Sequence, residues 1–153
     1  MISIVLFNPE IPENTGNIAR TCAATGMPLY LVRPLGFEIT EARVKRAGLD
    51  YWDKVSVTQI DDLGALMAQY GKEKFYFLSS KAQKSYAEAE FPPDAFLVFG
   101  KETKGLPPDL VADNADRALR IPMRPTLRCL NLANSVAIVA YEALRQHKYF
   151  DMN

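Results

Sequence analysis

Three short stretches contain more polar, glycine and proline residues than a packed core requires. They are NTGNIARTCAATG at 14–26, FGKETKGLP at 99–107 and IPMRPTLRCLNLANS at 121–135. The first predicts a helix that carries Asn17 and Arg20 on one face, with Asn14 at its start. Arginine in such a position can grip a phosphate, but a solvated surface arginine fits the pattern equally well.

The second stretch predicts an exposed loop after a buried strand. Gly100 directly follows apolar residues, and Gly105 and Pro107 then favour a tight turn. Glu102 lies in this turn, where its charged side chain has no role in packing a core. Such a loop presents backbone N–H and C=O groups, which suits an adenine or a ribose. An ordinary strand-to-helix turn has the same composition, so this loop alone decides nothing.

The third stretch repeats that design. Ile121 and Pro122 end a strand, and a loop then leads into a helix that starts near Asn131. If the strands before the two loops are neighbours, their basic residues form a cationic rim that can contact phosphates. Scattered solvated charges explain these residues equally well. The basic residues are Lys101, Lys104, Arg120, Arg124 and Arg128.

The segments that must position these stretches alternate between strand-like and helix-like patterns. Predicted strands are ISIVLF at 2–7, LYLV at 29–32, KVSVT at 54–58, KFYFLSS at 74–80, AFLVFG at 95–100 and RALRIPM at 117–123. Predicted helices run from about 14 to 26, 40 to 49, 61 to 71 and 131 to 148, the first capped by Asn14 or Thr15 and the third by Asp61 or Asp62. Residues 81–94 read mostly as loop. This order predicts one α/β domain over 1–153, with a parallel sheet and helices on both faces.

Composition narrows the class of protein. With 153 residues and 48% hydrophobic content the chain can bury its own core. No apolar run approaches the roughly 18 residues of a membrane helix, and the first residues do not read as a signal peptide, so we expect a cytoplasmic location and no membrane partner. Eighteen basic and eighteen acidic residues cancel, so any RNA site must be a local patch. Cys22 and Cys129 lack the spacing of a redox pair or a zinc site, so we expect no metal.

In combination and in this order, the three stretches closely resemble the motifs of the SpoU (TrmH) branch of the SPOUT RNA methyltransferases. The segments NPEIPENTGNIARTCAATG, RAGLDYW, FGKETKGLP and IPMRP...LNLANSVAIVAYEALRQ carry the resemblance, which covers essentially the whole chain. Within this branch the chain is most similar to the minimal members that modify the wobble nucleotide of tRNA. The resemblance implies a homodimer with a deep C-terminal trefoil knot, S-adenosylmethionine as cofactor, and 2′-O-methylation of cytidine or modified uridine in the anticodon loop, in leucine tRNAs.

The resemblance also implies roles for particular residues. Arg20 would be the catalytic residue, with Asn14 and Glu102 shaping the site and Asn131 near the methyl donor. A guanidinium stays protonated at neutral pH and is a poor proton acceptor, so we expect Arg20 to grip a phosphate and stabilise the developing alkoxide. Cofactor contacts would fall at Leu78, Gly100, Ile121, Met123, Cys129 and Leu130. The family often has serine where this chain has Cys129, a change that a backbone contact would survive.

RNA recognition must use the protein surface itself, because minimal members of the branch carry no separate RNA-binding domain. Residues proposed to contact RNA on this basis are Arg43, Arg46, Arg124, Arg128 and Tyr141, with Lys45, Tyr51 and Trp52 as further contributors. A dehydrogenase is a weak alternative, since no GxGxxG turn follows the first strand. A protein that binds RNA but has lost catalysis stays open as the second reading.

Overall fold

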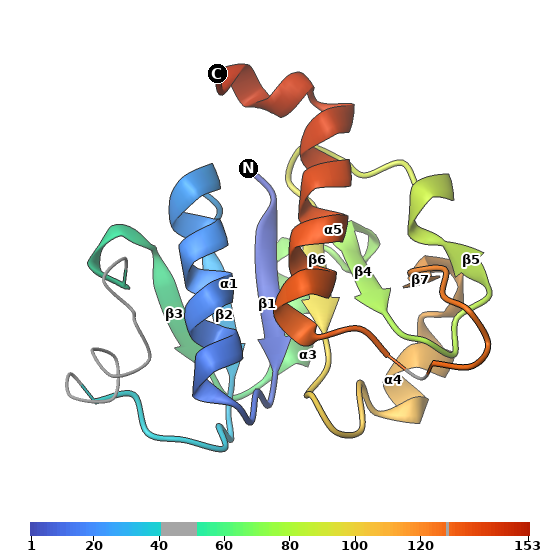
Figure 1. Cartoon of the computed structure of the whole chain (residues 1–153), viewed down its shortest axis with the longest axis horizontal. Helices are drawn as coiled ribbons and strands as arrows, with labels where there is room; N and C mark the ends of the chain where they lie inside the picture. Colours follow the sequence, from blue (N-terminus) through green and yellow to red (C-terminus); the bar gives the residue numbers. More distant parts are fainter. Residues whose placement is uncertain (41–51, 128) are drawn as a thin grey trace.

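A parallel sheet forms the centre of the protein, for which a computed structural model describes residues 1–40, 52–127 and 129–153 (Figure 1). In the described residues its seven strands follow the order β3-β2-β1-β6-β4-β7-β5, and every pair of neighbours is parallel. The strands are β1 Ser3–Phe7, β2 Leu29–Val32, β3 Val57–Ile60, β4 Phe75–Leu78, β5 Lys84–Ser85, β6 Phe96–Phe99 and β7 Ala118–Arg120. The parallel α/β sheet predicted from the sequence is confirmed.

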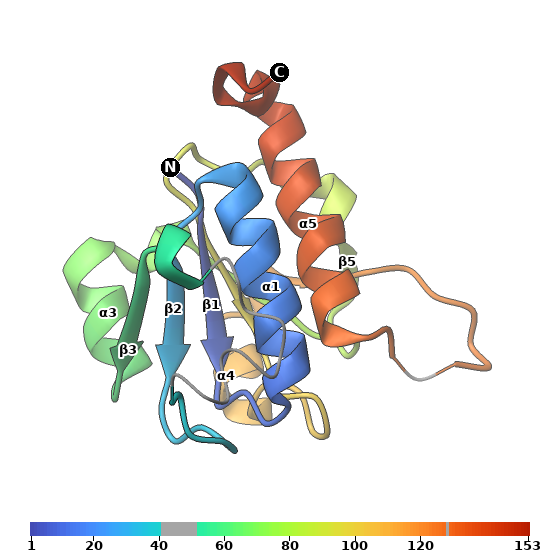
Figure 2. The same ribbon diagram turned by 60° about the vertical axis from the view of Figure 1, so that its left-hand side comes forward.

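Helices cover both faces of this sheet, as the alternating pattern predicted. The α-helices are α1 Pro12–Thr25, α3 Leu63–Tyr70, α4 Pro108–Asp113 and α5 Leu132–Gln146. Short 3₁₀ turns are η1 Trp52–Lys54, η2 Lys72–Lys74, η3 Tyr86–Glu88, η4 Ala115–Arg117 and η5 Lys148–Asp151. Figure 2 shows α1 and α5 side by side on one face and α3 on the other.

The alternation of side chains along the strands explains the two layers of core. One set of strand residues, such as Ile4 and Leu97, packs against the apolar stripes of α1 and α5, in which Ile18 and Val139 are fully buried. The opposite set packs against α3 and against partly buried residues of α4. This second set is Val5, Val32, Phe75, Phe77, Phe96 and Val98.

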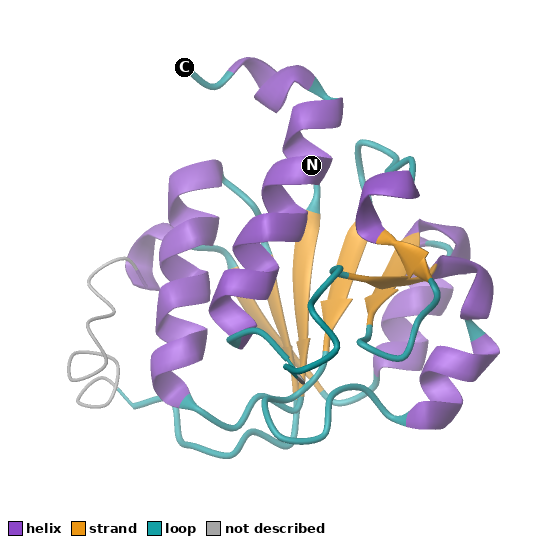
Figure 3. Cartoon of the chain, turned by 45° about the vertical axis from the view of Figure 1, so that its right-hand side comes forward, coloured by secondary structure: helices purple, strands orange, loops and turns teal. Residues whose placement is uncertain are grey.

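The central strands end level with one another, and this fixes where the loops meet. Phe99 pairs in register with both Leu6 and Leu78, and Leu78 pairs with Leu119. The segments that follow β1, β6, β4 and β7 therefore leave the same edge of the sheet side by side. Figure 3 shows the arrowheads of the central strands pointing to the edge where these loops gather.

Several predicted boundaries were wrong. Helix α1 begins at Pro12 rather than near Asn14, and its N-cap residue Ile11 makes no side-chain capping bond. The predicted cap of α3 is Asp62 by position, but it also makes no side-chain capping bond. Strand β7 ends at Arg120, so Ile121 lies beyond it. Strand β5 and helix α4 were not predicted, and the helix predicted at 40–49 lies almost entirely outside the described residues.

Candidate active site

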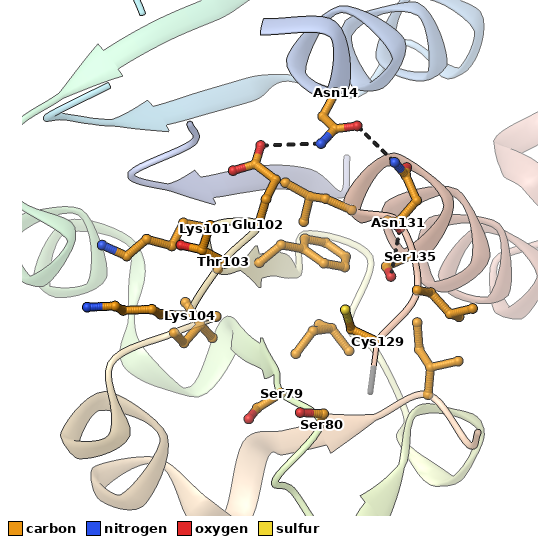
Figure 4. A pocket seen from close by; sticks show the side chains of 18 of the residues that line it. Asn14, Ser79, Ser80, Lys101, Glu102, Thr103, Lys104, Cys129, Asn131 and Ser135 are labelled. Carbon is orange, nitrogen blue, oxygen red and sulfur yellow. Dashed lines mark hydrogen bonds between the residues drawn. The ribbon is translucent and has the colours of Figure 1, made fainter. Parts of the chain in front are cut away.

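A cavity of about 490 Å³ opens at the carboxyl edge of the sheet, beside the ends of β6, β4 and β7 (Figure 4). Its wall comes from four segments that follow the four adjacent strands. These segments contribute Ile11 and Asn14, residues 78–81, residues 99–106, and residues 121, 123, 129–132 and 135. Ligands of open parallel sheets bind at this edge, outside the carboxyl ends of the strands.

Nine of the residues proposed from the sequence line this cavity together. They are Asn14, Leu78, Gly100, Glu102, Ile121, Met123, Cys129, Leu130 and Asn131. The predicted cationic rim assumed that the strands before its two loops are neighbours, but β4 lies between β6 and β7. Of the rim residues, Lys101 and Lys104 lie in the wall. Residues of the three separated stretches therefore meet at one cavity.

Arg20 is not in the wall of the cavity. It is exposed on α1, six residues and therefore about 9 Å along the helix axis beyond Asn14. Arg124 is exposed in the loop before α5 but does not line the cavity, and Tyr141 lies on α5 with 46% of its surface exposed. Three other proposed RNA contacts, Arg43, Arg46 and Arg128, lie outside the described residues, as do Lys45 and Tyr51.

A chain of polar side chains joins the three predicted stretches. Asn14 Nδ2 faces Glu102 Oε1 at 3.5 Å, and Asn131 Nδ2 donates to Asn14 Oδ1 at 3.0 Å. Asn131 Oδ1 accepts from the backbone N–H groups of Ala133 and Asn134, at 2.9 and 3.2 Å. Figure 4 shows the three side chains pointing toward one another on one side of the cavity.

The chemistry at the two ends of this chain fixes the orientation of both amides. A carboxylate can only accept, so the NH₂ group of Asn14 must face Glu102. A backbone N–H can only donate, so the oxygen of Asn131 must face the start of α5. The remaining oxygen of Asn14 and NH₂ group of Asn131 then face each other as acceptor and donor, and the chain is consistent from end to end.

Glu102 holds the segment that leads into α1. Its carboxylate accepts from the backbone N–H of Glu10 at 2.8 Å and of Ile11 at 3.2 Å. Both donors lie just before Pro12, the first residue of α1, where negative charge is favoured by the helix dipole. The predicted cap residue Asn14 lies inside the helix, and its side chain bonds to Glu102 and Asn131.

The loop after β6 is held tightly against itself. Gly105 has a φ of 67° and donates its N–H to Lys101 O at 3.1 Å, closing a turn. A Cβ built on Gly100 would lie 2.2 Å from the carbonyl carbon of Gly105 and 2.3 Å from the nitrogen of Leu106. Only glycine fits at position 100, and the backbone of residues 100–106 forms a compact wall of the cavity.

Sequence reasoning missed several residues of the wall. They are Ile11, Ser79, Ser80, Lys81, Phe99, Thr103, Leu106, Leu132 and Ser135. Four of them, Ser79, Ser80, Lys81 and Phe99, lie at the ends of predicted strands, and the small polar residues that end KFYFLSS were a usable signal for Ser79 and Ser80.

The two cysteines differ in accessibility. Burial raises the pKa of the Cys22 thiol to about 12, so this thiol in the core stays protonated. Cys129 is exposed at the cavity wall.

Among residues 1–40, 52–127 and 129–153, no cluster of three or more His, Cys, Asp or Glu side chains could hold a metal ion. In that same part of the chain, no helix combines the length and the apolar character needed to cross a bilayer.

Comparison with known proteins gives consistent results over almost the whole chain. The model of the SpoU rRNA methylase family matches residues 1–141. A Bacillus subtilis protein named as a candidate tRNA (cytidine(34)-2′-O)-methyltransferase is 51% identical, covering 99% of this chain and 96% of its own. The Escherichia coli tRNA (cytidine(34)-2′-O)-methyltransferase is 41% identical over 97% of this chain and 96% of its own. One solved structure comes from a study of 2′-OH methylation of C/U34 on tRNA. It superposes on this chain with a TM-score of 0.89 and 43% sequence identity, and the superposition covers 97% of this chain and 97% of the other.

Proposed function

Because this chain belongs to the SpoU rRNA methylase family, we propose that it methylates the ribose 2′-OH of nucleotide 34 in tRNA, using S-adenosylmethionine. The observation that carries the proposal is the cavity in which the three family-like motifs meet. Relatives of nearly equal length are named for this reaction. Cytidine or a modified uridine is the target nucleotide, and we extend the proposal to leucine tRNAs on the resemblance of the motifs.

The cavity suits S-adenosylmethionine in size and lining. Its volume lies within the roughly 300–1,000 Å³ of small-molecule sites. The apolar side chains of Leu78, Phe99 and Ile121 can pack against an adenine, and the hydroxyl of Ser79, which accepts from Lys81 N, can donate to a ribose or carboxylate oxygen. When bound, the cofactor supplies an electrophilic methyl group on a positively charged sulfur. The residues of the chain must then align a ribose hydroxyl with that methyl and take up its proton.

In this proposal, the polar side chains have different roles in shaping the site and in stabilising the reaction. Asn14, Glu102 and Asn131 form one connected chain, so they hold the walls of the site rather than remove a proton. Arg20 grips a phosphate next to the target ribose and stabilises the negative charge that develops on its 2′ oxygen. The cationic rim of Lys101 and Lys104 offers further contacts to RNA phosphates.

A homodimer explains how Arg20 can act although it lies outside the cavity of its own subunit. The outer surfaces of α1 and α5 carry Arg20, Ile138 and Tyr141, and the two apolar or aromatic residues are 36% and 46% exposed. We propose that a second subunit packs on this surface, so that Arg20 and Tyr141 of one subunit help to complete the site of the other. RNA contacts at Arg43, Arg46, Arg124 and Arg128 stay part of the proposal.

The proposal includes a deep trefoil knot at the C-terminus and a cytoplasmic location. The knot is part of what the resemblance of the motifs implies, and the parallel sheet with helices on both faces is consistent with it. Location in the cytoplasm is supported by the proposed substrate, since tRNA is modified there.

The function is tested by methyl transfer to total tRNA, with nuclease mapping of the methylated nucleotide. We expect one 2′-O-methyl group at position 34. Arg20→Ala should lose at least a hundredfold in kcat while keeping most of the affinity for S-adenosylmethionine, as expected for loss of transition-state stabilisation. Lys72→Ala is the matched control, because it removes an exposed cation from η2, at the opposite edge of the sheet. Binding of cofactor and tRNA without transfer would instead identify a protein that has kept the fold and lost catalysis.

A further inference from the structure

Two neighbouring loops beside the cavity are joined by two glutamate side chains, one from each loop. They are the loop after β1, residues 8–11, and the loop after β6, residues 100–105. Glu102 reaches from the second loop to the backbone of the first, as described above. In the opposite direction, Glu10 Oε1 accepts from the hydroxyl of Thr103 at 2.7 Å and from its backbone N–H at 3.2 Å. The two contacts together join the loops at two points.

Glu10 itself is not in the wall of the cavity, but Thr103 is. The side chain therefore acts on the site from outside. Lys101 and Lys104 flank the same contact, and the hydrogen bonds from Thr103 and the fields of these two lysines hold the pKa of Glu10 below its usual value. A glutamate is ionised at neutral pH even without this shift, and its negative charge strengthens the bonds that it accepts.

The backbone of Glu10 is fixed from its other side. Gly36 N donates to Pro9 O at 2.9 Å, and a Cβ at Gly36 would lie 2.8 Å from the Cα of Glu10. The segment after β2 thus packs directly against the residue whose side chain holds Thr103. Glu10 is anchored, and Thr103, at the exposed tip of the loop, is the group that it positions.

We propose that Glu10 is a positioning residue for cofactor binding, which holds the 100–105 loop in its binding shape through Thr103. The inference rests on the proposed function, since it takes this cavity to be the S-adenosylmethionine site. Without the contact, the loop keeps its own turn between Lys101 and Gly105 and its attachment through Glu102, but its tip at Thr103 is no longer held to the loop after β1. Glu10 contacts no reacting atom, so its loss acts on the affinity for the cofactor rather than on the chemical step.

Two pairs of variants test this role. Thr103→Val removes the hydroxyl at nearly constant size, and Thr103→Ser keeps it. Glu10→Ala removes both accepted bonds, whereas Glu10→Gln keeps an oxygen that can accept them. We expect Thr103→Val and Glu10→Ala to raise the Kd and KM for S-adenosylmethionine by about three- to thirtyfold, as for loss of bonds to a charged group. Thr103→Ser should match the wild type, Glu10→Gln should fall between, and kcat should change by less than about threefold.

Amide hydrogen exchange without any ligand gives a second measurement. Exchange at residues 101–105 should accelerate in Glu10→Ala and Thr103→Val, while the thermal midpoint of the protein stays near that of the wild type. Glu88→Ala is the matched control, because Glu88 also accepts a backbone bond, from Ser85 N at 2.8 Å, away from the cavity wall.

The outcomes separate the two proposals. Unchanged exchange and unchanged cofactor affinity in both Glu10→Ala and Thr103→Val would overturn the positioning role. A wild-type protein that binds no S-adenosylmethionine by calorimetry would instead overturn the assignment of the cavity, even if exchange at 101–105 responds as expected. A drop in kcat with unchanged affinity would also contradict the role, because it would place Glu10 in the chemical step.

Discussion

Replacement of Asn131 by alanine removes two interactions that can be separated by other substitutions. Its oxygen caps α5 by accepting from two backbone N–H groups, and its NH₂ group donates to Asn14. Loss of a helix cap costs about 1 kcal/mol, and loss of the side-chain bond about 1 kcal/mol more. We therefore expect Asn131→Ala to lower the free energy of unfolding by about 2 kcal/mol.

Serine and aspartate separate the two contributions. Asn131→Ser can cap α5 but cannot reach Asn14, so the expected loss falls to about 1 kcal/mol. Asn131→Asp also caps, and its charge is favoured at the start of a helix. It places Asn14 between two carboxylates, however, and the single NH₂ group of Asn14 cannot face both Glu102 and Asp at position 131. We expect near wild-type stability in this variant, together with a clear loss of affinity for S-adenosylmethionine.

Urea unfolding and calorimetric titration measure these two effects independently. A change of 1 kcal/mol shifts the thermal midpoint of a domain of this size by about 2–4 °C, so Asn131→Ala should melt about 4–8 °C lower. The reasoning would be refuted if alanine and serine variants unfolded at the same urea concentration as the wild type. Wild-type cofactor affinity in Asn131→Asp would show that the chain of side chains through Asn14 does not shape the site.

Three further predictions follow from the cavity wall and the core. Gly100→Ala should abolish cofactor binding in calorimetry, because its Cβ would meet the backbone after β6, whereas Gly105→Ala meets no atom within 4 Å and should cost only about 1–2 kcal/mol for its positive φ. Iodoacetamide at pH 8 should label Cys129 and spare the buried Cys22, whose pKa is about 12, and mass spectrometry should find slower labelling once S-adenosylmethionine is bound. Lys104→Ala should weaken tRNA binding and reduce the slope of log K against log salt by about 0.7–0.9; an unchanged slope would remove Lys104 from the RNA contacts.

Sequence patterns predicted the site well because parallel strands impose a simple geometry. Once AFLVFG and RALRIPM are recognised as strands of one parallel sheet, the residues after them must leave the same edge. This rule places Gly100 and Ile121 at the same edge of the sheet, although β4 lies between their two strands. The resemblance of the motifs, and not composition, implied that these two residues contact the cofactor, and it also implied the roles of Asn14 and Asn131.

The boundary of α1 was missed although a local signal was present. Pro12 stands at the first helical position and Glu13 in the first turn, a combination that favours a helix start before Asn14. The contact of Glu102 with the backbone of Glu10 and Ile11 comes from the far half of the chain and could not be predicted from neighbouring residues. Strand β5 is similar, since its two residues are extended only through pairing with β7.

Helix α4 was missed although its signal was also present in the sequence. Pro108 stands at the first helical position and Asp109 in the first turn, a combination that favours a helix start. With only six residues, however, the helix is too short to show a periodic apolar face. The position of Arg20 outside the cavity could not be predicted either, since helical spacing gives the face of α1 and not what packs on it.

The wall of the cavity extends from Ile11 to Ser135 along the chain, so the cavity cannot exist in a partly synthesised protein. A ribosome delivers the chain in order, and the loops after β1 and β4 are made long before α5 closes the site. A cofactor that binds only the finished cavity therefore stabilises completed molecules and none of the shorter nascent forms. Cells that are well supplied with the cofactor would selectively protect full-length protein from proteolysis, while truncated products would gain nothing from it.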